Sequence, residues 1–233
     1  MRLKEIIIVA GAVVLTGFFI GQGLQKFNRN ERAISVRGLA EKEVTANVAV
    51  WKINYKVSSA RLEDVRKNLP EAQIVIQEFL KQHKFADNEI VKGSRIVDRQ
   101  AQDYGAEKGN RFVANGYFVV TTKNVQQVAE SEQAIDELLK KGLVITSNQV
   151  EYYFTDLNQI KPSMLDEATQ NAKEAANGFA KSMDVSVGKL KSATQGVFSI
   201  ENPIGDDAGY DQEKRSSLKK KVRVVTQVEF YIN

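Results

Sequence analysis

The chain lacks cysteine altogether and has few of the residues that most often carry out chemistry. Its 233 residues include no Cys, one His, one Trp and three Pro. The absence of Cys excludes a disulfide framework, a thiolate nucleophile, a Cys-ligated metal and a lipid-modified N-terminal Cys. With a single His, zinc or copper would lack its usual ligands. We therefore expect no bound cofactor or metal.

The chain also lacks a strong excess of charge of one sign. It has 33 basic and 29 acidic residues, a net charge of +4 and a pI of about 9.1. This surplus is small and spread along the chain, so nucleic-acid binding is not expected. The hydrophobic fraction of 42% and the charged fraction of 27% are typical of an ordered globular protein.

The longest hydrophobic run in the chain lies at its N-terminus. It comprises 19 consecutive uncharged residues from Ile6 to Leu24 and follows the basic residues Arg2 and Lys4. A helix of this length spans about 28 Å, close to the roughly 30 Å hydrocarbon core of a bilayer. We therefore predict a single-pass anchor within residues 1–27 and a domain over residues 28–233. The apolar side chains expected to contact the bilayer are Ile6, Ile7, Ile8, Val9, Val13, Val14, Leu15, Phe18, Phe19, Ile20 and Leu24.

A cleavable signal peptide is the alternative for this segment, because a basic start before an apolar run opens both kinds of sequence. The candidate cleavage site at residues 21–23, Gly-Gln-Gly, lacks the usual Ala-x-Ala end. The run is also longer than the roughly 7 to 15 residues typical of a signal peptide. Charge leaves the orientation open, since Lys26, Arg29 and Arg32 follow the run and offset the basic residues before it.

Hydrophobic periodicity predicts an α+β fold. Alternation of apolar residues with period two indicates strands, and spacings of three and four indicate helices. Strands are expected at residues 34–38, 43–57, 89–100, 111–122, 143–157, 187–200 and 218–232. Helices are expected at residues 60–83, at 125–142 and from Pro162 to Met183. This order predicts antiparallel sheets, built from β-hairpins, packed against about three helices.

Three local features add detail to this fold. Apolar residues change face near Ala49, which indicates a bulge or a strand buried on both sides. Pro70 is expected to kink or split the first helix. The last helix carries an apolar stripe that is expected to pack closely on a sheet. This stripe consists of Met164, Leu165, Ala168, Ala172, Ala175, Phe179 and Met183.

Two segments resemble the SIMPL-domain family. The family's opening strands, in which a Gly-containing turn leads into a long strand, are similar to residues 34–57, ISVRGLAEKEVTANVAVWKINYKV. Its Ala-rich helix, V-x-x-G-K-L turn and following strand are similar to residues 164–200, MLDEATQNAKEAANGFAKSMDVSVGKLKSATQGVFSI. The resemblance extends over about residues 33–233. One departure is Ala46-Asn47, where many members carry Pro-Asp.

The resemblance implies a mainly bacterial, extracytoplasmic protein with no established enzymatic activity. Some members are similar to channel-like, ring-forming envelope proteins, others are linked to stress tolerance, and a eukaryotic relative is a signalling adaptor. It also implies that the domain over residues 28–233 lies outside the cytoplasm, on a chain held in the bacterial inner membrane. A shared fold does not transfer any one of these functions.

The titratable residues that stand out have structural explanations. His83 ends the apolar stripe of the first helix, where a capping or packing role is expected. A catalytic base is not expected, because no Gly-x-Ser-x-Gly or similar partner motif is present. Asp206, Asp207, Asp211 and Glu213 lie close together but lack EF-hand spacing, which favours a solvated loop over a weak calcium site.

One cluster of basic residues occurs near the C-terminus, in the sequence KRSSLKKKVR. It consists of Lys214, Arg215, Lys219, Lys220, Lys221 and Arg223. These residues could contact anionic lipid or a partner. The alternative is an ordinary charged strand entry, which pairs with nearby acidic residues and guards an exposed edge against aggregation.

These features predict a non-enzymatic, membrane-anchored envelope protein with a SIMPL-like interaction domain, acting in envelope maintenance or stress defence. Its expected partners are the bilayer, through the N-terminal helix, an envelope protein of undetermined identity, and further copies of the chain. The alternative is an oligomeric ring-like or channel-like envelope assembly. An enzyme is the weakest hypothesis, and it would require a deep pocket lined by several titratable groups.

Overall fold

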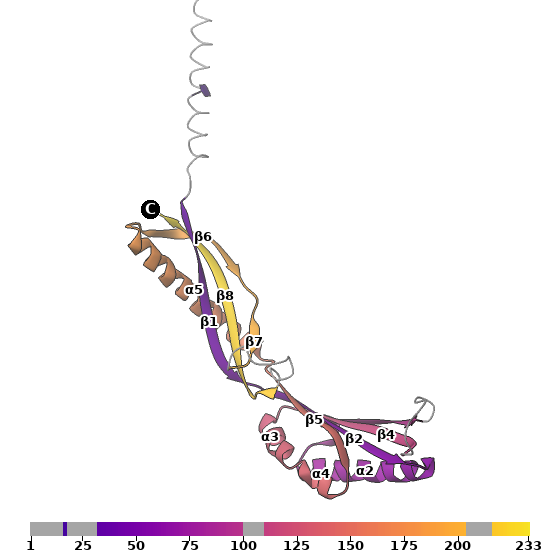
Figure 1. The fold of residues 1–233 in the computed structure, drawn as a ribbon. Helices are drawn as coiled ribbons and strands as arrows, with labels where there is room; N and C mark the ends of the chain where they lie inside the picture. The colour runs from indigo at the N-terminus through magenta and orange to yellow at the C-terminus, as the bar shows by residue number, and fades with distance from the viewer. Residues whose placement is uncertain (1–15, 18–31, 100–109, 204–215) are drawn as a thin grey trace, which may run out of the picture. The chain divides into compact units, whose positions relative to one another are not determined.

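A computed structural model describes residues 16–17, 32–99, 110–203 and 216–233 (Figure 1). The chain forms two compact units. Unit 1 comprises Met1–Leu39, Ala168–Gly196 and Val225–Asn233, and unit 2 comprises Ala40–Glu167 and Val197–Val224. Three elements contribute residues to both units: β1 (Ala33–Thr45), α5 (Leu157–Ser182) and β8 (Lys219–Ile232).

The described residues confirm the α+β fold. The other elements are β2 (Val48–Ser59), α2 (Leu62–Gln82), the 3₁₀ turn η1 (Asp87–Glu89), β3 (Ile90–Asp98), β4 (Phe112–Thr122), α3 (Val125–Gln133), α4 (Asp136–Lys140), β5 (Val144–Tyr153), β6 (Val187–Gln195) and β7 (Ser199–Glu201). The strands form two antiparallel sheets. Within the described part of residues 32–203 the α-helices are α2, the short pair α3 and α4, and α5.

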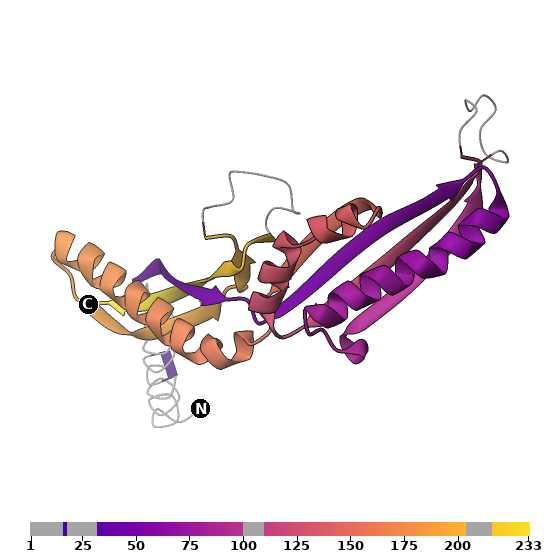
Figure 2. The ribbon, with the colours of Figure 1, turned by 90° about the horizontal axis from the view of Figure 1, so that it is seen from below.

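The sheet of unit 2 has the strand order β3-β4-β2-β5, and neighbouring strands are antiparallel. Helices α2, α3 and α4 cover one of its faces (Figure 2). Successive side chains of a strand point to opposite faces, and Trp51, Ile53 and Tyr55 of β2 are fully buried on the covered face. They share one apolar core with Phe79 of α2 and Phe118 of β4.

The change of face near Ala49 comes from a break between two strands and not from a bulge at that point. β1 and β2 are separate strands with Ala46 and Asn47 between them, so the predicted strand over residues 43–57 is wrong at its start. The Ala46 N–H donates to the carbonyl of Leu218 (2.9 Å), a residue far along the chain. A register shift does exist, but it lies farther along β2, where this strand pairs with β5.

Two helix predictions need correction. α2 is continuous although Pro70 lies inside it, so this proline does not split the helix. Proline has no N–H, so the Arg66 carbonyl lacks its usual donor in the helix. Pro70 and Arg66 are both exposed, so water can donate a hydrogen bond to that carbonyl. The predicted helix over residues 125–142 is two short helices, α3 and α4. The second of these is followed, as expected, by Gly142, whose φ is +82°.

Two glycines of the unit 2 sheet lie directly opposite tyrosines. Gly116 of β4 pairs with Tyr55 of β2, and Gly93 of β3 pairs with Tyr117 of β4. A Cβ on Gly116 would clash with the Tyr55 ring, and one on Gly93 would lie 2.6 Å from the Tyr117 hydroxyl oxygen. Each ring therefore lies over the glycine opposite it, and the two rings lie on opposite faces of the sheet. Such cross-strand pairs help to fix the strand register.

Unit 1 contains α5 packed on a sheet with the strand order β1-β8-β6. The buried side of α5 in this unit consists of alanines spaced four apart, namely Ala168, Ala172, Ala176 and Ala180. Small side chains let a helix approach a strand closely. Gly38 of β1 is the point of closest approach, because a Cβ there would lie 2.6 Å from the Ala172 backbone nitrogen.

The last predicted helix and the strand after it also need correction. α5 begins at Leu157, so Pro162 lies within the helix and not at its first turn. Phe179 and Met183 do not belong to the buried stripe, since 54% and 61% of their surfaces are exposed. The close approach to the strand leaves room only for small side chains, and the alanines occupy it. The predicted strand over residues 187–200 is two strands, β6 and β7.

Candidate functional site

The predicted membrane span, residues 6–24, lies outside the described residues except for Thr16 and Gly17, which are helical and exposed. Within the part of the chain that the structure describes, no helix is long and apolar enough to cross a membrane. The anchor and its alternative, a signal peptide, stay predictions. Lys214, Arg215 and the acidic residues between 206 and 213 also lie outside the described ranges.

Strand alternation separates the basic residues near the C-terminus. Lys219 at the start of β8 is exposed, whereas only 3% of the surface of Lys220 is exposed, and burial lowers the pKa of Lys220. Lys221 and Arg223 approach Glu41 of β1 at 4.0 Å and 3.6 Å. Lys219, Lys221 and Arg223 therefore share one face of β8 and only Lys220 lies on the other, and two of the three are directed toward a carboxylate.

His83 has a packing and capping role. It is the C-terminal cap of α2, and its ring lies 4.5 Å from that of Phe79 between centroids. Its backbone carbonyl accepts a hydrogen bond from the Gln127 side chain of α3. Among the residues that the structure describes, no three His, Asp or Glu side chains are grouped so as to hold a metal ion.

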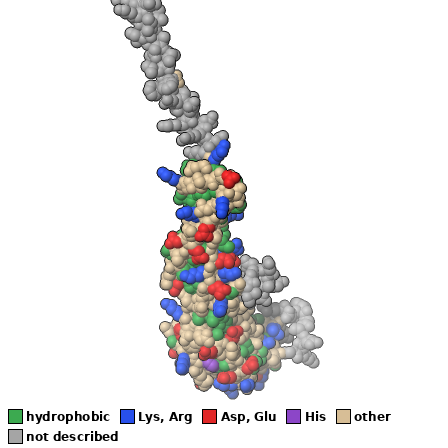
Figure 3. All heavy atoms as spheres, turned by 90° about the vertical axis from the view of Figure 1, so that its left-hand side faces the viewer, with side chains coloured by type: hydrophobic (Ala, Val, Ile, Leu, Met, Phe, Trp, Pro, Cys, Tyr) green, Lys and Arg blue, Asp and Glu red, His purple; other side chains and the backbone are tan. Residues whose placement is uncertain are grey.

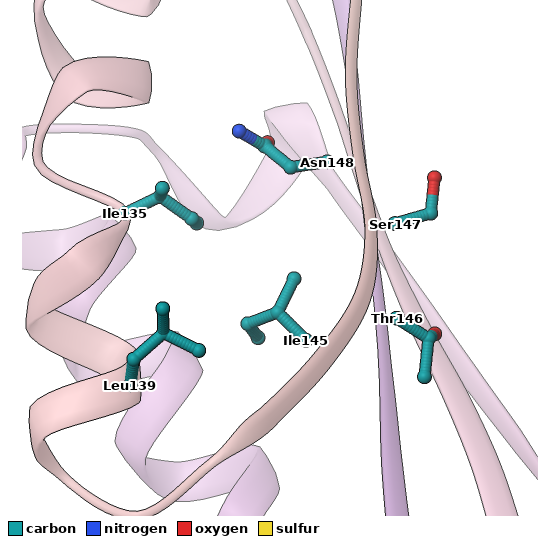
Figure 4. A pocket seen from close by; sticks show the side chains of 6 residues that line it. All are labelled: Ile135, Leu139, Ile145, Thr146, Ser147 and Asn148. Carbon is teal, nitrogen blue, oxygen red and sulfur yellow. The ribbon is translucent and has the colours of Figure 1, made fainter.

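A small pocket of about 300 Å³ lies between α4 and the edge strand β5 (Figure 4). It is lined by Ile135, Leu139, Ile145, Thr146, Ser147 and Asn148. Ile135, Leu139 and Ile145 point toward one another, whereas Ser147 points away. The Asn148 side-chain oxygen accepts a 2.6 Å hydrogen bond from Trp51 Nε1. The pocket thus offers apolar surface suited to one small apolar group.

A second hollow, of about 510 Å³, lies where β4 leads into α3. It is lined by Val48, Glu89, Thr121, Thr122, Lys123 and Asn124. Asn124 is the N-cap of α3, and its side-chain oxygen accepts from the Gln127 N–H at 3.2 Å. The Asn124 N–H in turn donates to the Thr122 hydroxyl at 3.1 Å. Capping of α3 therefore accounts for the polar side chains of Thr122 and Asn124.

Glu132 and Tyr152, at the edge of the unit 2 core, have shifted pKa values. Burial raises the pKa of the Glu132 carboxyl group of α3. Burial also raises the pKa of the Tyr152 hydroxyl of β5, and the negative charge of Glu132 raises it further. Neither residue lines either of the two hollows, so burial at the edge of the core accounts for these shifts.

The face of the unit 2 sheet opposite the helices, here called the open face, carries exposed apolar side chains. Val91 and Tyr117 lie on it and are 61% and 43% exposed, and Val119 lies directly opposite Val91. Lys52 and Glu151 form a 3.1 Å ion pair on the same face. Exposed apolar side chains that lie together, with polar residues around them, are a feature of contact surfaces.

Sequence analysis missed the open face. In the predicted strand over residues 111–122, Phe112, Ala114, Phe118 and Val120 alternate with more polar positions, a pattern that indicates only one apolar face. The sequence does contain one indication of the open face, because Tyr117 and Val119, at two of these alternate positions, are apolar.

Comparison with known proteins places the chain in a family. Residues 34–230 match SIMPL, described as a protein of unknown function (DUF541). No curated protein matches the sequence. The match runs from β1 to β8, includes parts of both units and covers well over half of the 233 residues. It confirms the resemblance drawn from residues 34–57 and 164–200, and the chain therefore belongs to the SIMPL family.

Proposed function

We propose that this SIMPL protein is a non-enzymatic, single-pass protein of the bacterial inner membrane whose domain lies in the periplasm and binds other envelope molecules. In this role it acts in envelope maintenance or stress defence. The membrane assignment draws on the uncharged run of 19 residues that follows Arg2 and Lys4. The observation that carries the binding role is the open face of the unit 2 sheet.

The open face has the properties of a preorganised binding surface. Its Tyr117 ring lies over Gly93 of the neighbouring strand, where the absence of a Cβ leaves room for the ring. A side chain that is already ordered loses little conformational freedom on binding. Tyrosine is also enriched at protein interfaces, because its ring is apolar and its hydroxyl can bond to the partner.

The location of the domain is the first prediction to test. A reporter enzyme that is active only in the periplasm should be active when fused after Asn233, and a reporter active only in the cytoplasm should be silent. Replacing both Val14 and Leu15 with Arg should abolish membrane insertion, because each charge at the centre of the span costs roughly 2.5–3.5 kcal/mol. Membrane flotation and the two reporters measure the result.

The matched control exchanges the same two side chains as Val14→Leu and Leu15→Val, which leaves the span apolar and should leave insertion unchanged. The reverse reporter pattern would remove the envelope assignment. A soluble wild-type protein whose N-terminus lies near Leu24 would identify the segment as a signal peptide. In that case the prediction of a membrane anchor is wrong, and the proposal that the domain is exported still holds.

The alternative function is a ring-like or channel-like assembly of identical chains. It is favoured by the open face together with β3 and β5, which are the terminal strands of the unit 2 sheet. Edge strands present unpaired backbone groups that a second copy can bond.

Light scattering of the full chain in detergent, coupled to size exclusion, distinguishes this assembly from a single chain. An assembly through the open face should dissociate on Tyr117→Glu. It should persist on Ile74→Glu, a matched change at a 55% exposed position on α2. The mass of a single chain at every concentration would rule out the assembly.

A further inference from the structure

Unit 1 carries apolar and basic side chains together at the end where β1 begins. We propose that this end of unit 1 lies against an anionic lipid surface and inserts Phe179 and Met183 among the lipid headgroups. The inference rests on the proposed membrane anchor. It adds a second contact between the protein and the bilayer, made by the folded domain itself.

Hydrogen bonds place the connection between α5 and β6 beside the start of β1. The Ile232 N–H donates to the Arg32 carbonyl at 3.0 Å, just before β1. Ser186, in the connection, and Asn233 exchange two backbone hydrogen bonds of 3.1 Å and 3.0 Å. The start of β1, the end of β8 and the end of α5 therefore lie at the same end of unit 1 (Figure 1).

The end of α5 holds the two apolar side chains in an exposed position. Asp184 has a φ of +53°, and the Val185 N–H donates to the Ala180 carbonyl at 3.0 Å. These are features of a Schellman cap, which ends the helix in a defined conformation. Phe179 and Met183 are four residues apart, so they lie on one side of the helix. Each lies three residues after a buried alanine, Ala176 or Ala180, at the margin of the buried stripe, and the two large side chains are exposed to solvent.

The charges around these side chains are mainly positive. Between residues 179 and 191 the charged side chains are Lys181, Asp184, Lys189 and Lys191, all of them exposed. Glu229 of β8 is a second nearby carboxylate and accepts a hydrogen bond from the Ser192 hydroxyl. Figure 3 shows Lys and Arg side chains around hydrophobic ones at this end of unit 1. Apolar side chains surrounded by lysines are typical of proteins that bind the interface of anionic bilayers.

The length of chain between the predicted span and β1 keeps this end near the membrane. Eight residues, 25–32, separate Leu24 from Ala33. Fully extended, they reach about 30 Å. They include Lys26, Arg29 and Arg32, so the sequence between the predicted span and β1 is itself basic. Because the anchor holds the domain at high local concentration, a contact that is weak by itself is sufficient to keep it on the lipid surface.

The absence of cysteine makes a direct test simple, since one introduced Cys is the only site for a label. Met183→Cys places a polarity-sensitive fluorophore at the proposed contact. Leu39→Cys is the matched control, because it is an exposed apolar position of the same unit about 20 Å farther along β1. The full-length protein is reconstituted into vesicles of phosphatidylcholine and phosphatidylglycerol in equal parts, with a quencher attached to the lipid headgroups.

Quenching at position 183 should exceed quenching at position 39 by roughly threefold, because only the first label reaches the headgroups. It should decrease in vesicles of phosphatidylcholine alone. In the Met183→Cys background, Lys181→Glu, Lys189→Glu and Lys191→Glu together should lower quenching to the level of position 39. The protein should still float with the vesicles, since the anchor is unchanged.

Each other outcome overturns a defined part of the proposal. Equal quenching at positions 183 and 39, in protein that floats with the vesicles, overturns the lipid contact and leaves the anchor standing. Equal quenching at position 183 in the two lipid compositions overturns the anionic character of the surface. Protein that does not float overturns the proposed anchor, and the lipid contact with it.

Discussion

Replacing Gly38 with alanine is expected to lower the free energy of unfolding of unit 1 by about 3 kcal/mol. The added Cβ would clash with the Ala168 carbonyl oxygen and would lie 2.6 Å from the nitrogen and 2.8 Å from the Cβ of Ala172. Two of these three atoms belong to the backbone of α5, so they cannot rotate away. The helix must shift from the strand, and packing is lost along its alanine stripe. Faster hydrogen exchange of amides in β1 and α5 measures the effect.

Gly178→Ala is the matched control within the same helix. A Cβ at Gly178 meets nothing within 4 Å, and the residue is exposed. Alanine has a higher helix propensity than glycine, so this change should stabilise α5 by up to about 1 kcal/mol. The same chemical change thus has opposite signs at the two positions. If Gly38→Ala alters stability by less than about 0.5 kcal/mol, α5 does not pack on β1 as described.

Replacing Trp51 with alanine should destabilise unit 2 by about 3–5 kcal/mol. Trp51 has no exposed surface and is the only tryptophan in the chain. Its ring packs against Phe79 and Phe85, with centroids 6.2 Å and 5.9 Å away. Alanine would leave a cavity in the apolar core that Trp51 shares with α2 and β4. Urea unfolding followed by far-UV circular dichroism measures the loss without requiring the tryptophan signal.

Trp51→Phe separates packing from hydrogen bonding at this position. Phenylalanine keeps most of the apolar surface but leaves the Asn148 oxygen without its indole donor, so a loss of about 1–3 kcal/mol is expected. Ile74→Ala, at an exposed position on α2, is the control and should change stability by less than about 0.5 kcal/mol. A loss below about 1.5 kcal/mol for Trp51→Ala would show that this core is not closed around the ring.

The parts of the fold that were predicted correctly depend on local patterns. The apolar positions of α2 include Val65, Ala72, Ile76 and Phe79, and all four are buried. The alternation of β8 also holds, because Val222, Val224, Thr226, Val228 and Phe230 are buried. In both elements most of the large apolar side chains face the core, with Ile74 of α2 an exposed exception. Periodicity is then sufficient to identify the buried face.

The predictions that were wrong concern contacts between distant residues. The buried face of α5 depends on contact with β1, where Gly38 lies against Ala168 and Ala172, residues 130 or more positions away in sequence. Size alone therefore pointed to Phe179 and Met183 as buried, and both are exposed. The break between β1 and β2 is likewise fixed by hydrogen bonds from Ala46 to Leu218 and from Asn47 to Tyr153.

The candidate surfaces also differ in whether the sequence alone could predict them. Which face of the unit 2 sheet stays open depends on where three helices pack, and no pattern in β3 or β4 alone contains this information. The basic cluster is different, because its separation was open to prediction. Lys219, Lys220 and Lys221 are consecutive residues of one strand, so their side chains must alternate between the two faces. Lys220 therefore lies on the opposite face from Lys219 and Lys221, although the three are consecutive in sequence.

The pairing of β1 with β8 determines when each part of the chain can fold. The Gln227 side chain donates to Ser35 Oγ across a separation of 192 residues. By contrast, the sheet of unit 2 is formed from strands within residues 48–153. During synthesis that sheet can form while the C-terminal part of the chain is still in the ribosome. β1 is synthesised before the sheet of unit 2, but it can pair only after β8, the last strand, has been synthesised. A chain released before β8 therefore has a first strand without a partner, however complete the sheet of unit 2 is.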